Sequence, residues 1–199
     1  MGREEVLRAV RTALGRANNG ADEPPPALDD RPIPREEIPD PVARFVVELE
    51  AVAGEAIDSG TGDWQEIVRD IAAAAGLRHV VVGPDVDVDN LGLQRVTLEE
   101  AWRRPEEVLG LVRAEHAIAE SGSVVLETDG VHAPSTFTAS SVVLLAKADI
   151  VAALEDLPSS ADARARIIVT GPSRTSDIEK RLVLGAHGPR RLVVVLTDR

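Results

Sequence analysis

Short runs of aliphatic and β-branched residues recur along the chain and alternate with segments of helical periodicity. The runs are continuously apolar, which is typical of strands that are covered on both faces. The alternation predicts an α/β fold, with a mostly parallel sheet and helices on both faces. The predicted strands are residues 80–82, 124–126, 142–145, 167–169 and 192–196.

Apolar residues three and four positions apart mark the helical segments. Two of these segments begin with the pattern of a capping box, Asp63 with Glu66 and Thr97 with Glu100. Gly76 ends the first of the two. The predicted helices are residues 3–17, 41–58, 63–75, 98–103, 149–155 and 177–184.

A proline-rich segment separates the first predicted helix from the rest of the chain. Residues 18–40 contain Pro24-Pro25-Pro26 together with Asn, Asp and Glu, and proline neither donates a hydrogen bond nor fits a helix interior. The sequence therefore predicts two parts: residues 1–40, an N-terminal helical arm with its linker, and residues 41–199, the α/β domain. An arm that docks onto a second subunit would make the protein a homo-oligomer.

One antiparallel pair is predicted inside the α/β domain. Residues 117–120 and 123–127 flank a tight turn at Ser121-Gly122. In a hairpin of this kind, Ser and Gly simply shape the turn. The alternative is that Glu120 and the hydroxyls of Ser121 and Ser123 line a crevice, where a carboxylate beside hydroxyls can act as a base, nucleophile or substrate ligand.

The second candidate motif follows the predicted strand 167–169. A Gly-Pro turn leads through hydroxyl residues to the predicted helix 177–184, so backbone N–H groups at that helix start would favour a small anionic ligand. We expect this crevice beyond the carboxyl ends of the strands. In the alternative interpretation, Ser176 and Glu179 only cap the helix. The candidate residues are Gly171, Ser173, Arg174, Thr175, Ser176, Asp177 and Glu179.

Charge and composition exclude several classes of function. The 22 Lys and Arg residues against 34 Asp and Glu residues give a net charge of −12, which argues against a nucleic-acid binder. The mean hydropathy is −0.04, and no run approaches the length of a membrane span. The N-terminus lacks the pattern of a secretion signal, so we expect a cytoplasmic protein.

The chain contains no cysteine, which excludes disulfides, thiolate nucleophiles and cysteine-ligated iron–sulfur clusters. We therefore expect no cofactor bound directly, and any electron has to be carried by another chain or by a dissociable group. The four histidines show no metal-ligand spacing, so no metal site is predicted. His187, in a Gly-Ala-His-Gly-Pro loop, either contacts a ligand or hydrogen-bonds to the backbone.

Taken together, the two motifs and the loop of His187 resemble the LUD domain family, in particular its lactate-utilisation members. The resemblance rests on residues 117–123, 170–179 and 184–189, which occur in the same order in the family. It implies a fold like that of ribose-5-phosphate isomerase, glucosamine-6-phosphate deaminase and the coenzyme-A transferases. Ser121 and Ser123 stand where threonine is common in the family.

The resemblance also implies a function. It points to an accessory subunit in the oxidation of L-lactate to pyruvate, acting with iron–sulfur lactate-utilisation proteins and carrying no cluster itself. It transfers no catalytic residue, so the catalytic residues stay unknown and it is left open whether this chain is an enzyme. Two alternatives remain: an enzyme acting on a phosphorylated or coenzyme-A-linked small molecule, and a binding module that senses a hydroxy acid. In every case we expect the two serine-bearing turns to converge.

Overall fold

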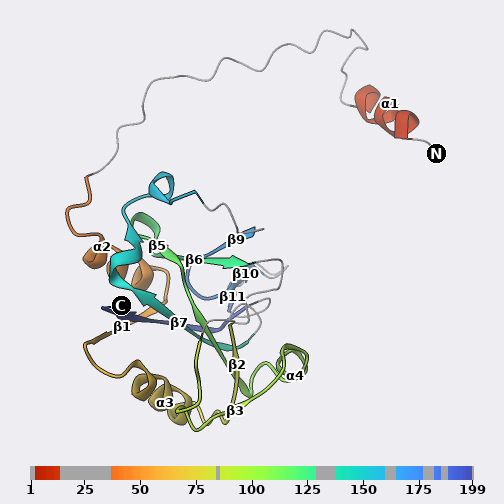
Figure 1. Cartoon of the computed structure of the whole chain (residues 1–199). Helices are drawn as coiled ribbons and strands as arrows, with labels where there is room; N and C mark the ends of the chain where they lie inside the picture. Colours follow the sequence, from red (N-terminus) through yellow and green to blue (C-terminus); the bar gives the residue numbers. More distant parts are fainter. Residues whose placement is uncertain are drawn as a thin grey trace. The chain divides into compact units, whose positions relative to one another are not determined.

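The computed structural model describes residues 3–13, 37–83, 86–128, 138–159, 165–176, 182–184 and 188–198. The chain divides into two compact units, residues 1–36 and 37–199. In the first unit, helix α1 (Arg3–Ala13) confirms the predicted N-terminal helix, while residues 14–17 lie outside the described residues (Figure 1). Val6 and Val10 of α1 are exposed.

The second unit contains short helices and many strands. The helices are α2 (Pro41–Ala51), α3 (Trp64–Ala74) and α4 (Leu98–Arg103), with 3₁₀ turns η1 (Ala119–Ser121), η3 (Lys147–Asp149) and η4 (Leu154–Asp156). The strands are β1 (Glu55–Gly60), β2 (His79–Val82), β3 (Gln94–Arg95), β4 (Val108–Arg113), β5 (His116–Ile118), β6 (Ser123–Thr128), β7 (Ser140–Ala146), β8 (Ile150–Val151), β9 (Ala165–Val169), β10 (Arg174–Ser176), β11 (Leu182–Leu184) and β12 (Arg191–Thr197).

The centre of this unit is a six-stranded sheet in the order β1-β12-β7-β4-β2-β3, in which all neighbouring strands run parallel. Five consecutive residues of β7, from Ser141 to Leu145, are buried, as the continuous apolar run predicts. The predicted α/β fold with a mostly parallel sheet is confirmed.

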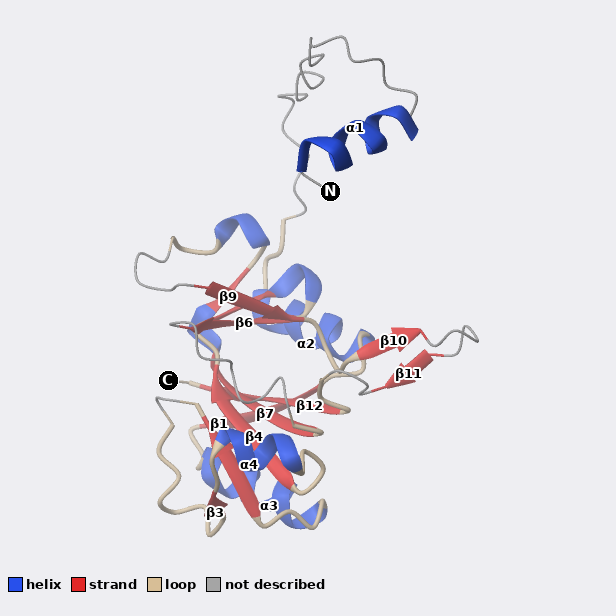
Figure 2. Ribbon diagram, turned by 90° about the vertical axis from the view of Figure 1, so that its right-hand side faces the viewer, coloured by secondary structure: helices blue, strands red, loops and turns tan. Residues whose placement is uncertain are grey.

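The two faces of the parallel sheet pack against different partners. Alternate residues of β7 point to opposite faces: Val143 packs in one core cluster with Phe45 of α2, and Leu144 packs in another with Val68 of α3. The first cluster also contains Val124 of a second sheet, so α2 and this second sheet cover the same face of the parallel sheet (Figure 2). The predicted helical cover is therefore present on both faces, and on one face the second sheet adds to it.

This second sheet has the order β8-β5-β6-β9. The predicted antiparallel hairpin is confirmed, since β5 pairs with β6 around η1 and Gly122. Strand β9 then pairs antiparallel with β6. Two of the predicted strands, 124–126 and 167–169, therefore do not belong to the parallel sheet.

The helix predicted over 41–58 is too long. Helix α2 ends at Ala51, and β1 begins at Glu55 after Ala53, which has a φ of 65°. A side chain at Gly54 would lie 2.3 Å from the Leu49 side chain, so this reversal places the chain directly against α2. Ala56 and Ile57 continue the helical spacing of the apolar residues in α2, so the sequence did not indicate that β1 begins here.

Two other helix predictions are wrong where the structure describes the residues. Residues 149–155 form short 3₁₀ turns around the two-residue strand β8. Leu182–Leu184, the end of the helix predicted over 177–184, form β11, which pairs antiparallel with β10, and residues 177–181 lie outside the described residues. The second error arose because a Leu-Val-Leu run of this length fits either structure. The sequence analysis also missed the buried central strand β4, whose run Val108–Arg113 is interrupted by Gly110. Helices α3 and α4 begin and end within one residue of the predicted bounds.

Candidate functional site

The structure brings the two serine-bearing turns together. Because Val124 of β6 pairs with Val169 of β9, the start of one strand lies beside the end of the other. The Ser123 and Thr170 hydroxyl oxygens are 2.7 Å apart, and the Ser121 and Ser123 hydroxyl oxygens are 2.8 Å apart. We call Ser121, Ser123 and Thr170 the hydroxyl corner. Ser123 is buried and Thr170 is exposed, so the corner runs from the interior to the surface.

The glycines beside the hydroxyl corner are explained by packing against the end of α2. A Cβ at Gly122 would lie 2.2 Å from the Leu49 backbone nitrogen, and one at Gly171 would lie 2.7 Å from the Val52 carbonyl oxygen. Both glycines have positive φ, 62° and 69°. Both therefore have a structural reason to be glycine that needs no ligand.

Glu120 is hydrogen-bonded to other parts of the chain. Its Oε1 accepts a hydrogen bond of 3.0 Å from the Leu154 backbone N–H, and its own N–H donates to the Ala152 carbonyl. Its carboxylate thus satisfies the start of η4. The residue is exposed, and its predicted role toward a ligand stays a prediction.

The second motif forms a short strand just before the position of the predicted helix start. Arg174, Thr175 and Ser176 make up β10, and the Arg174 side chain is exposed. Strand β10 pairs with β11, and residues 177–181, where the helix start was predicted, lie outside the described residues, so an anion site at that helix start stays a prediction. Asp177, Glu179 and His187 lie outside the described residues.

The hydroxyl corner lies at the amino edge of the parallel sheet. The Ser173 N–H donates to the Pro189 carbonyl, just before β12 begins, and the Arg191 N–H donates to the Ala139 carbonyl, just before β7 begins. Gly122 lies against Leu49 of α2 and Gly171 against Val52 just after the helix, and β1 begins three residues beyond Val52. The prediction that this motif lies beyond the carboxyl ends of the parallel strands is wrong, because β9 belongs to the other sheet.

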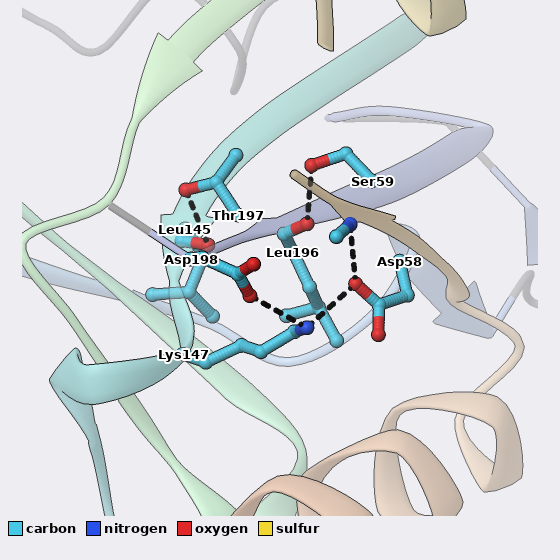
Figure 3. A network of polar contacts seen from close by, with 8 residues as sticks. Asp58, Ser59, Leu145, Lys147, Leu196, Thr197 and Asp198 are labelled. Atoms are coloured by element: carbon cyan, nitrogen blue, oxygen red, sulfur yellow. Dashed lines mark hydrogen bonds and ion pairs between the residues drawn. The ribbon is translucent and has the colours of Figure 1, made fainter. Parts of the chain in front are cut away.

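A different group of side chains occupies the carboxyl edge. The Lys147 ammonium lies 2.7 Å from an Asp58 carboxylate oxygen and 2.9 Å from an Asp198 carboxylate oxygen (Figure 3). These residues lie at the carboxyl ends of β7, β1 and β12, which are neighbours in the sheet. We call Asp58, Lys147 and Asp198 the carboxyl-edge cluster.

The charges of this cluster reinforce one another. Hydrogen bonds from Lys147 and from the Gly60 N–H lower the pKa of Asp58, and the bonds to Asp58 and Asp198 raise the pKa of Lys147. Both shifts favour the charged forms of Asp58 and Lys147, and the formal charges of the three side chains sum to −1. Next to them, the Ser59 hydroxyl donates to the Leu196 carbonyl and joins β1 to β12.

Sequence reasoning missed the carboxyl-edge cluster. Lys147 and Lys180 are the only lysines in the chain, and Lys147 directly follows a predicted strand, which was a usable signal. Asp58 was hidden because it lay at the end of a predicted helix. Among the described residues, no three His, Asp or Glu side chains gather as metal ligands. None of the described helices has the length and apolar composition of a membrane-spanning helix.

Comparison with known proteins bears on the resemblance found in the sequence. Residues 107–197 match the LUD domain, which confirms the resemblance to this family. The chain is 27% identical to lactate utilization protein C of Anoxybacillus flavithermus over 168 residues, covering 72% of this chain and 74% of that protein. It is 33% identical to lactate utilization protein C 1 of Bacillus mycoides over 106 residues, which is 45% of this chain and only 43% of that protein.

A solved structure supports the fold. A DUF162 family protein from Deinococcus radiodurans superposes with a TM-score of 0.55 and 18% identity, covering 79% of this chain and 96% of that one. At this identity the likeness concerns the architecture alone.

Proposed function

We propose, from the match of residues 107–197 to the LUD domain, that this chain takes part in lactate utilisation. The single observation that carries the proposal is the similarity to a lactate utilization protein C over about three quarters of both chains. We further propose that the chain is an accessory subunit in the oxidation of L-lactate to pyruvate, together with iron–sulfur partner proteins.

The chemistry requires an electron acceptor. Converting lactate to pyruvate releases two electrons and two protons, and the electrons need an acceptor. Since the sequence has no cysteine, this chain cannot ligate an iron–sulfur cluster through thiolates. An iron–sulfur partner that accepts the electrons satisfies the balance, and this chain then assists in assembly or in presenting the substrate.

The experiment is an anaerobic pull-down of the tagged chain from its native cell, followed by assays of iron, sulfide and activity. We expect iron–sulfur proteins to be recovered and L-lactate to reduce an added dye, with pyruvate formed in equal amount. D-lactate is the substrate control.

Two outcomes contradict the proposal. One is that the purified chain oxidises L-lactate by itself, which would make it a complete enzyme. The other is that the recovered iron–sulfur proteins oxidise lactate equally fast after this chain has been removed. Recovery of an iron–sulfur protein whose oxidation of L-lactate depends on this chain would support the proposal.

A further inference from the structure

Helix α1 exposes the apolar side of an amphipathic sequence. Val6 and Val10 are 42% and 49% exposed, and Ala13 is exposed as well. Positions 6, 10 and 13 are four and three residues apart, so they form one stripe along the helix. A single helix of this length is only marginally stable in water, and helices of this kind gain most of their stability from packing of the apolar side. A second protein surface that covers the stripe would therefore stabilise α1.

The charged residues of α1 follow an order along the helix. Glu4 and Glu5 lie in its first turn, and the sequence places Arg8 at its middle and Arg11 near its end. Positions 4 and 11 are seven residues apart, close to two helical turns, so they lie on the same flank of the apolar stripe. The same order suits the helix dipole, but the dipole does not account for an exposed stripe beside it. A helix with this stripe and this order of charges is complementary to a reversed copy of itself.

We propose that α1 pairs with the α1 of a second copy of this chain, with the two helices antiparallel and their apolar stripes in contact. The start of α1, residues 3–5, carries a net charge of −1, and its later part, with Arg8 and Arg11, carries +2. Antiparallel pairing places the acidic start of each helix beside the basic end of the other, whereas parallel pairing places like charges together. The contact uses the same surface on both copies, as a two-fold dimer requires.

The charges of α1 favour a second copy over a membrane as the partner. An anionic membrane surface attracts amphipathic helices whose polar side is rich in lysine and arginine, and α1 carries Glu4 and Glu5 beside its arginines. Two helices of this length bury less surface than a standard protein interface, so we expect a weak dimer whose population rises with concentration. This inference does not depend on the proposed role in lactate utilisation.

The test measures the association state of the full chain by sedimentation velocity over a concentration series. One variant combines Glu4→Arg with Glu5→Arg, and the other combines Arg8→Glu with Arg11→Glu. Each variant makes the charges of α1 predominantly one sign, so we expect its self-association to weaken at least tenfold. An equimolar mixture of the two variants restores opposite charges across the pair, and we expect it to form a mixed dimer.

Val10→Asp tests the apolar stripe, and we expect it to weaken the dimer at least tenfold. Val47→Asp is the matched control, because Val47 is 60% exposed on α2 of the second unit, and its substitution should leave the dimer unchanged. Circular dichroism checks that the second unit of each variant is folded. The proposal is overturned if the wild-type chain stays monomeric, if the charge variants self-associate as the wild type does, or if their mixture forms no mixed dimer. Tighter self-association of the variant with added arginines would also overturn it, and would indicate that α1 binds an acidic surface instead.

Discussion

The two edges of the parallel sheet differ in how their side chains are used. At the amino edge, the hydroxyl corner is partly buried, and the glycines beside it touch the backbone or side chains of α2. At the carboxyl edge, the cluster is ionic, with a partly buried Lys147 between two more exposed aspartates. The comparison teaches that the most motif-like segment can be explained by packing, whereas the ion pairs at the opposite edge join side chains from three separate positions in the chain.

If the amino edge is a packing site, Gly122→Ala has the largest effect. The new Cβ would collide with the backbone of Leu49 at 2.2 Å and also suffer the strain of positive φ, so we expect a loss of about 3 kcal/mol or more in the free energy of unfolding. Urea denaturation measures this loss.

The matched control is Gly76→Ala. Gly76 has a similar φ of 68°, but no atom lies within 4 Å of its Cβ position. The control therefore isolates the backbone strain, expected to cost about 1 kcal/mol. Equal losses at both positions would show that close packing on α2 is not what requires glycine at position 122.

Ser123→Ala tests the interior of the hydroxyl corner. Removing the buried hydroxyl takes a partner from both Ser121 and Thr170, and we expect a loss of about 1 kcal/mol in the free energy of unfolding. Ser59→Ala is the counterpart at the carboxyl edge, since its hydroxyl makes one bond in a less buried place. A larger loss for Ser59→Ala would reverse the contrast between the edges.

Glu115 lies just after the carboxyl end of β4, and its raised pKa makes the stability of this edge depend on pH. Burial raises the pKa of Glu115 above 4.5, and repulsion by Glu127 adds to the rise, although the Glu127 N–H donates to its carboxylate. The folded state therefore holds this proton more tightly than the unfolded chain. Protonated Glu115 therefore stabilises the folded state at pH values below the ordinary pKa of a glutamate. This stabilisation is lost as the pH rises through the raised pKa of Glu115 in the folded protein.

Glu115→Gln keeps an acceptor for the Glu127 N–H and removes the unfavourable charge. We expect it to stabilise the protein at pH 7 by roughly 0.5–1 kcal/mol, with the gain disappearing below about pH 4. Melting temperatures measured at both pH values test this expectation. A gain that persists at the lower pH would exclude the charge as its cause.

Lys147→Met is expected to have the smallest effect on stability. Lys147 is partly buried, but both aspartates are about half exposed and solvent screens the ion pairs, so the melting temperature should change by no more than about 2 °C, and added salt should reduce the difference further. Scanning calorimetry at low and high salt measures this. A large, salt-independent loss would mean that the cluster ties the strand ends together, which would make the two edges alike.

Local pattern was sufficient for much of the architecture. Continuous apolar runs identified strands such as β7 and β12, and the Thr97–Glu100 capping box identified α4, because these signals lie within a few neighbouring residues. The same kind of reasoning failed at residues 55–60 and 182–184, where short apolar segments fit a helix or a strand equally well. Pairing with β12 and with β10 decided those segments.

For the candidate sites too, part was predictable from local sequence and part was decided by the tertiary structure. The sequence by itself determined that no thiolate chemistry is available, and it identified the two serine-bearing turns that the Ser123–Thr170 contact joins. Only the tertiary structure decided that these turns lie at the amino edge and that Asp58, Lys147 and Asp198 meet at the other. The physical reason is that strand order places residues far apart in the chain at one edge, and no local periodicity encodes that order.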